Sequence, residues 1–133
     1  LLPRLIRASL ALSSQILSRH MHEMSIAESV VDAITTEAAR SAFSRVEKVV
    51  LEVGALSCVD PHALQFGFDA ATRGTCAEGA ALEIKTPAGQ AQCFGCGQEV
   101  VIARKGLACP ECGSHQLVVT HGDELKIKSL EVV

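Results

Sequence analysis

The sequence has no tryptophan and no tyrosine, and only four phenylalanines among its 133 residues. Proteins that bind single-stranded nucleic acid stack bases on aromatic side chains, so this scarcity argues against such a surface. No apolar run reaches the roughly 18 residues that a membrane-spanning helix needs, so we expect no membrane span. Because 48% of the residues are hydrophobic, the chain can still bury a core, which argues against intrinsic disorder. These absences leave a folded protein with one main domain and room for a small second module.

Acidic residues are missing from the first part of the chain and frequent in the rest. Residues 1–21 carry three arginines and no acid, although the whole chain has a net charge of -3. The body that follows is therefore distinctly acidic, and an acidic body is a poor match for a phosphate backbone. Net charge favours cations or basic partners over nucleic acid.

The opening segment is rich in Leu, Ser and Arg, and three interpretations of it compete. A cationic targeting peptide has this composition, and an amphipathic N-terminal helix is an alternative. Because Met21 offers an available start, we expect residues 1–20 to be a non-native or disordered extension. We expect residues 21–90 and 122–133 to form one domain around an inserted module at 91–121.

Two helices are predicted from periodicity and capping residues. Apolar residues recur at helical spacing from Met24 to Ala38, and Ser25 with Glu28 fits a capping box, so we expect a helix over about 25–41. Asp60 followed by Pro61 is typical of an N-cap and first helical residue. A second helix is therefore expected to begin there and to stop before the glycine at position 74.

Alternating apolar and polar residues predict three strands, at 46–53, 81–86 and 125–132. The alternation of the last strand slips near Ser129, which indicates a β-bulge. The predicted fold class is therefore α+β: a small three-stranded sheet covered by two helices, plus an inserted zinc-ribbon-like domain.

Four of the six cysteines fall into two C-x-x-C pairs, each followed by glycine. Two such turns facing each other place four thiolates around one tetrahedral ion, which favours Zn²⁺ over iron or redox chemistry. We expect the glycines to let the backbone turn and direct N–H groups at the sulfurs. The predicted zinc ligands are Cys93, Cys96, Cys109 and Cys112.

A site closed by four protein ligands has no open position, so we expect this zinc to be structural. The alternative is a site whose geometry changes, with His115 or His121 replacing a cysteine, although such histidines are more often solvated surface groups. Cys58 and Cys76 are expected to be small buried hydrophobes, because no histidine is placed beside either one.

The residues Met21-His22-Glu23 hold nitrogen donors within a few bonds of one another. A free amine at Met21, two early amides and the imidazole would suit the flattened arrangement that Ni²⁺ or Cu²⁺ prefers. The residues ahead of Met21 convert that amine into an amide and remove one donor. On composition alone, the histidine is more simply a solvated side chain.

Several segments together resemble the hydrogenase nickel-incorporation accessory proteins of the HypA/HybF type. The resemblance runs in order through residues 21–25, 54–68 and 78–80, the two C-x-x-C pairs, and 130–132. It implies an α/β nickel-binding domain with an inserted zinc domain. It also implies a cytoplasmic, non-catalytic metallochaperone that passes Ni²⁺ to the large subunit of [NiFe] hydrogenase with a partner GTPase.

Carried over by position, the resemblance makes His22 the nickel ligand, with Glu23 as its neighbour, and the four paired cysteines the zinc ligands. Asp60 matches an acidic position near the nickel arm, but N-capping is its simpler role. The client, which could also be a urease, and a homodimer are left open. The alternative function is a zinc-ribbon module for nucleic acid or transcription. We find no nucleophile–base pair and no phosphate loop, so no enzyme is expected.

Overall fold

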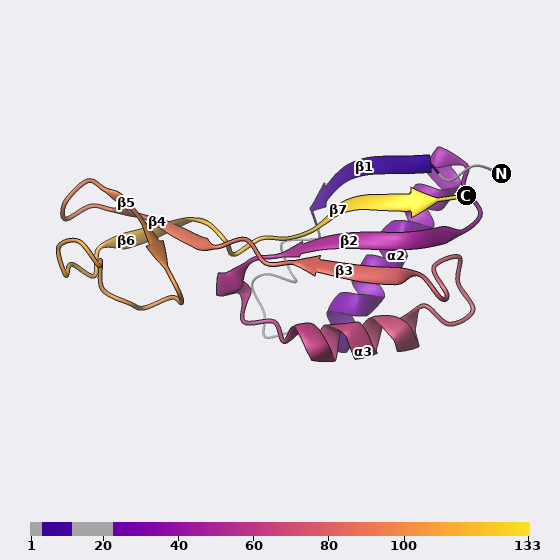
Figure 1. Cartoon of the computed structure of the whole chain (residues 1–133), viewed down its shortest axis with the longest axis horizontal. Coiled ribbons are helices and arrows are strands. Elements are labelled where there is room, and N and C mark those ends of the chain that lie inside the picture. Colours follow the sequence, from indigo (N-terminus) through magenta and orange to yellow (C-terminus); the bar gives the residue numbers. More distant parts are fainter. Residues whose placement is uncertain (1–3, 12–22) are drawn as a thin grey trace.

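The structure is a computed structural model that describes residues 4–11 and 23–133. Figure 1 shows two parts: a sheet covered by helices, and a smaller β-module that extends from one end of that sheet. The C-terminal end of the chain lies at the end of the sheet that is remote from the module. The predicted α+β class, with two helices and an inserted cysteine module, is confirmed.

The main sheet has four strands in the order β1-β7-β2-β3. β2 and β3 run parallel, whereas β7 is antiparallel to both β1 and β2. The strand bounds are β1 Arg4–Ala11, β2 Val46–Val53, β3 Ala81–Lys85 and β7 Leu125–Val132. The three predicted strands are thus confirmed, with the second ending at Lys85.

The main sheet has one strand more than the three predicted, and this strand, β1, lies within residues 1–20, which were expected to be a non-native or disordered extension. Residues 4–11 pair with the outer edge of β7, from Arg4 opposite Val132 to Ala11 opposite Lys126. Ile6 packs against the core, and the Arg4 guanidinium donates to the carbonyl of Ala42 at 3.1 Å. Three contacts hold β1 on the sheet: its backbone pairing with β7, the partly buried Ile6 side chain, and the Arg4 cation at the C-terminus of α2.

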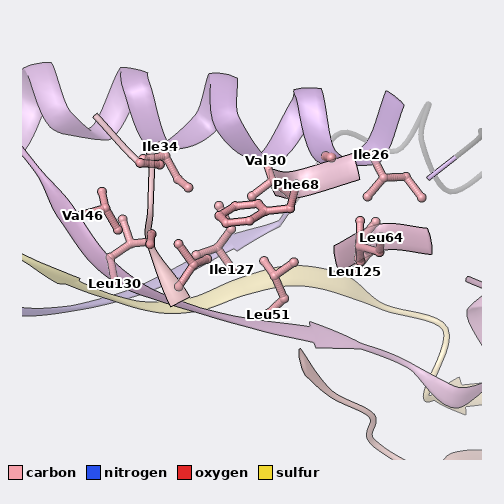
Figure 2. Close-up of a cluster of buried hydrophobic side chains, with 14 of the residues drawn as sticks. Ile26, Val30, Ile34, Val46, Leu51, Leu64, Phe68, Leu125, Ile127 and Leu130 are labelled. Atoms are coloured by element: carbon pink, nitrogen blue, oxygen red, sulfur yellow. The ribbon is translucent and has the colours of Figure 1, made fainter. Parts of the chain in front are cut away.

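Two helices cover one face of the main sheet: α2 Glu23–Ser41 and α3 Pro61–Ala71. Figure 2 shows their apolar side chains directed toward those of the strands, which closes the main core. Among the described residues, neither helix is long and apolar enough to cross a membrane. The labelled core residues are Ile26, Val30, Ile34, Val46, Leu51, Leu64, Phe68, Leu125, Ile127 and Leu130.

The two helix starts differ in how well the sequence predicted them. Asp60 is the N-cap of α3, as expected, and its carboxylate accepts N–H groups of His62 at 2.9 Å and Ala63 at 3.5 Å. The prediction of a capping box at Ser25 is wrong, because α2 begins at Glu23 and Ser25 lies inside the helix. The glutamate in the first turn is favourable at the positive end of a helix.

The predicted bulge in β7 is confirmed. The pairing with β2 steps from Val50 opposite Ser129 to Leu51 opposite Ile127, which leaves Lys128 as the extra residue. The bulge lets Ile127 and Leu130 both face the helices although they are an odd number of positions apart.

The cysteine module is the second sheet, with the order β5-β4-β6 and antiparallel pairing. Its strands are β4 Gly89–Cys93, β5 Glu99–Ile102 and β6 Leu117–His121. In the chain the module lies between β3 and β7, as predicted, and β4 begins slightly before the expected start at residue 91. We refer to residues 89–122 as the cysteine module.

The cysteine module meets the main domain where three glycine backbones pass very close to one another. A Cβ on Gly54 would lie 2.0 Å from the carbonyl oxygen of Gly122, and one on Gly122 would lie 2.5 Å from the Cα of Gly89. Two backbone hydrogen bonds stabilise this crossing. The Gly54 N–H donates to the Glu124 carbonyl at 2.8 Å, and the Leu56 N–H donates to the Gly122 carbonyl at 2.7 Å. Only glycine allows this approach.

Candidate metal centre

The four paired cysteines converge within the cysteine module. Their sulfur atoms all lie within 4.8 Å of one another. The Cys93 and Cys112 sulfurs are 3.6 Å apart, and those of Cys96 and Cys109 are 3.9 Å apart. A tetrahedron of thiolates at ~2.3 Å from Zn²⁺ has edges of ~3.8 Å. The four sulfurs therefore fit a zinc ion, and all four coordination positions would be taken by the chain.

Two similar turns build this arrangement. Gly97 N–H donates to the Cys93 carbonyl at 2.9 Å, and Gly113 N–H donates to the Cys109 carbonyl at 2.8 Å. Both glycines have positive φ, 77° and 78°, which a side chain disfavours. The glycines therefore turn the chain as predicted, but their N–H groups bond to carbonyls rather than to sulfurs.

The N–H groups that reach sulfur come from inside each C-x-x-C loop instead. Gly95 N–H lies 3.3 Å from the Cys93 sulfur, and Glu111 N–H lies 3.4 Å from the Cys109 sulfur. Such bonds spread the negative charge of four thiolates around a divalent ion and fix the direction of the ligands.

The thiols of the centre differ in acidity when no metal is bound. The backbone N–H of Cys96, helped by that of Gly95, lowers the pKa of the Cys93 thiol to about 7 against the effect of burial. For Cys112, a bond from the Ser114 amide lowers the pKa, but burial and the three neighbouring sulfurs outweigh it and raise the pKa to about 12. Binding of zinc must therefore displace protons.

The remaining histidine and cysteine candidates stay outside this centre. Within residues 4–11 and 23–133, the four cysteines are the group with metal-binding geometry, and it includes neither His115 nor His121. Both histidines are exposed, and His121 faces Glu99 at 3.8 Å. Cys76 packs against the main core, as expected of an apolar residue. Cys58 was expected to be buried and is exposed instead.

The second predicted metal-binding segment adjoins the start of α2. His22 lies outside the described residues, whereas Glu23 is the first residue of α2. The Glu23 carboxylate accepts the backbone N–H of Asp60 at 3.2 Å. In a capping box, a glutamate inside the same helix accepts the N–H of the N-cap residue. Glu23 performs this role for α3 from the neighbouring helix.

A close packing contact between the two helices accompanies this interhelical cap. Gly67 of α3 is buried, and a Cβ on it would lie 3.3 Å from the Met24 Cα, so the two helices touch at the first turn of α2. The first turn of α2 is therefore held against α3, with Glu23 at the residue that caps α3.

Comparison with known proteins decides the family. The sequence profile described as "Hydrogenase/urease nickel incorporation, metallochaperone, hypA" matches residues 21–132. A hydrogenase maturation factor HypA of Bradyrhizobium sp. (strain ORS 278) is 53% identical over 112 residues, which cover 84% of this chain and 99% of that protein. A HypA of Alkalilimnicola ehrlichii is 54% identical with the same coverage. The chain belongs to the HypA family.

The solved HypA structures agree at the level of the fold. The solution structure of the Ni metallochaperone HypA from Helicobacter pylori matches with a TM-score of 0.65 and 24% identity, covering 85% of this chain and 98% of that one. Membership of the HypA family makes this chain a nickel-incorporation metallochaperone, and the four-cysteine centre suits the structural zinc predicted for it. These findings support the nickel hypothesis over the nucleic-acid alternative.

Two features that shape the site of this HypA-family chain were not predicted. One is the bond from the Asp60 amide to Glu23, which joins residues 37 positions apart. The other is Leu56, which lies in the turn after β2 but is buried among residues of the cysteine module. No local motif signals either contact, because each depends on how distant segments meet.

Proposed function

We propose that this chain carries Ni²⁺ at an arm formed by His22 and Glu23 and delivers it during maturation of a [NiFe] hydrogenase. The observation that carries the proposal is the family match, which begins at Met21 and so includes the Met-His-Glu segment. Relatives of about 50% identity bear the name hydrogenase maturation factor. We infer the same role for this chain.

The chemistry of the arm suits a carried ion rather than a resident one. Imidazole and backbone nitrogens with a carboxylate nearby match the nitrogen and oxygen donors that favour Ni²⁺. One oxygen of Glu23 already accepts the Asp60 amide, so we assign Glu23 mainly to orienting the arm and His22 to binding. A site with few protein ligands can release its ion to a recipient, whereas the four-cysteine centre retains zinc.

The proposed cycle has three steps: capture of Ni²⁺ by the arm, docking on a partner, and exchange of ligands onto the recipient. We expect the recipient to be the hydrogenase large subunit and the partner to be a nickel-insertion GTPase in the cytoplasm. This chain would bind and orient the ion without catalysing a reaction, so any nucleotide hydrolysis would come from the partner. Whether the chain forms a homodimer is a separate prediction that analytical ultracentrifugation can decide.

Calorimetric titration of Ni²⁺ into the zinc-loaded full chain tests this proposal. We expect His22→Ala to abolish the tight binding and the matched control His62→Ala to retain it, because His62 is an exposed histidine in the first turn of α3. A chain starting at Met21 should bind more tightly than the full chain, since it offers an amine where the full chain has an amide. Equal binding by His22→Ala and the unmodified chain would exclude the arm as the site.

A further inference from the structure

The core of the cysteine module is completed by a side chain from the main domain. Leu56 lies in η1 (Ala55–Ser57), the short 3₁₀ helix that follows β2, and is only 2% exposed. It belongs to the buried cluster of the module and not to the main core. Two other members of the cluster are predicted zinc ligands. The cluster consists of Leu56, Ala91, Cys93, Val100, Ile102 and Cys109.

Backbone hydrogen bonds and side-chain packing both fix the position of Leu56. Its N–H donates to the Gly122 carbonyl at 2.7 Å, and the preceding Ala55 N–H donates to the Pro87 carbonyl at 2.9 Å. A Cβ on Gly89 would lie 2.5 Å from the Leu56 Cγ, so the first residue of β4 leaves room for the leucine. The side chain therefore cannot shift unless the module shifts with it.

A short, constrained segment joins Leu56 to the start of α3. The Ser57 hydroxyl donates to the Gly54 carbonyl at 2.6 Å, and Cys58 turns the chain in the left-handed region at φ 59°. Asp60 follows, caps α3 with its carboxylate, and donates its N–H to Glu23. The segment 56–60 thus links the core around the predicted zinc ligands to Glu23, the residue that follows His22 in the sequence.

We propose that Leu56 is the positioning residue through which zinc binding holds the start of α3, and with it Glu23, in place. Without zinc, four thiols lose their common centre and the small cluster loses the ion that organises two of its members. Leu56 then loses the ordered side chains against which it packs. As a result, the segment 56–60, including Asp60, becomes more mobile. This inference rests on the proposed function only for its consequence at the nickel arm.

Amide hydrogen exchange tests the link directly. The reporters are the His62 and Ala63 amides, which the Asp60 carboxylate protects. In the unmodified full chain, we expect removal of zinc by a chelator to speed their exchange at least tenfold. In the zinc-loaded Leu56→Ala variant, we expect the same fast exchange. The matched control is zinc-loaded Ile102→Ala, which also removes a buried aliphatic side chain from the cluster but from β5, so protection should remain.

Two further measurements separate positioning from a general loss of structure. Leu56→Met keeps the apolar volume and should restore protection in the zinc-loaded state, even if Leu56→Ala holds zinc poorly. Unchanged exchange on zinc removal, or equal exchange in Leu56→Ala and Ile102→Ala, would overturn the proposal. In nickel titrations, zinc loading should raise the affinity of the unmodified chain at least threefold and that of Leu56→Ala hardly at all. If His22→Ala binds nickel normally, the proposed arm is wrong while the exchange result still decides the role of Leu56.

Discussion

Replacing Gly54 by alanine tests the close crossing of backbones between the main domain and the cysteine module. The added Cβ would meet the Gly122 carbonyl oxygen at 2.0 Å, whereas ordinary contact begins at 3.4 Å. The segment that carries Gly122 would have to retreat by more than 1 Å. This position has φ -57°, so the substitution adds no backbone strain and its cost comes from the contact alone.

The size of the effect follows from what that retreat breaks. The Gly122 carbonyl accepts the Leu56 N–H, and Gly54 itself donates to Glu124, so two backbone hydrogen bonds are at risk. Each lost bond costs about 1 kcal/mol. Forced displacement in a packed region costs about 1–3 kcal/mol more. We therefore expect Gly54→Ala to lower the free energy of unfolding by about 3–5 kcal/mol, a large part of the total for a small domain.

Urea unfolding at a fixed zinc concentration, followed by circular dichroism, measures this loss. The matched control is Gly74→Ala, at a position with φ +77° and no atom within 4 Å of the added Cβ. A left-handed alanine costs about 1–2 kcal/mol, so the control should lose clearly less stability. If Gly54→Ala unfolds at the same urea concentration as Gly74→Ala, the crossing is not the tight contact described above.

Three further predictions concern single side chains. Asp60→Ala removes the N-cap of α3 and should cost about 0.5–2 kcal/mol in thermal unfolding, while Asp60→Asn should recover most of it, since asparagine also caps helices. Arg4→Ala removes the cation at the C-terminus of α2 and should cost about 0.3–1 kcal/mol, an effect that would shrink in high salt; a salt-independent loss would contradict the electrostatic explanation. The apparent zinc affinity, measured by chelator competition, should fall more steeply with falling pH below about 7 than above it. Below that pH the Cys93 thiol regains its proton, which competes with the ion for the sulfur. A constant slope through pH 7 would show that the pKa of Cys93 is not lowered.

The parts of the fold that were predictable depend on local pattern. β2 alternates because Val49, Leu51 and Val53 face the helices, and this period of two is visible in the sequence. The C-x-x-C turns are likewise local, since each knuckle closes within a few residues. The convergence of the four cysteines could therefore be predicted from the sequence, although not which amides would reach the sulfurs.

The parts that were missed depend on contacts between distant segments. β1 has a mixed composition, and its place follows from the free edge of β7, to which it pairs more than a hundred positions away. The motif at Ser25 fits a capping box by spacing, yet α2 begins at Glu23, whose carboxylate bonds to the Asp60 amide. Leu56 looked like an ordinary apolar residue in a turn. In each case a tertiary partner, rather than propensity, decides the structure.

The position of β7 in the main sheet sets the order in which the chain can fold during its synthesis. β7 lies between β1 and β2, yet it is translated after the whole cysteine module. Until β7 emerges from the ribosome, β2 exposes one unpaired edge and the helices cover an unfinished core. The four cysteines, by contrast, are translated before β7, so they can bind zinc before the main sheet is complete. Availability of zinc to the nascent chain should therefore influence how much of the protein reaches its folded state.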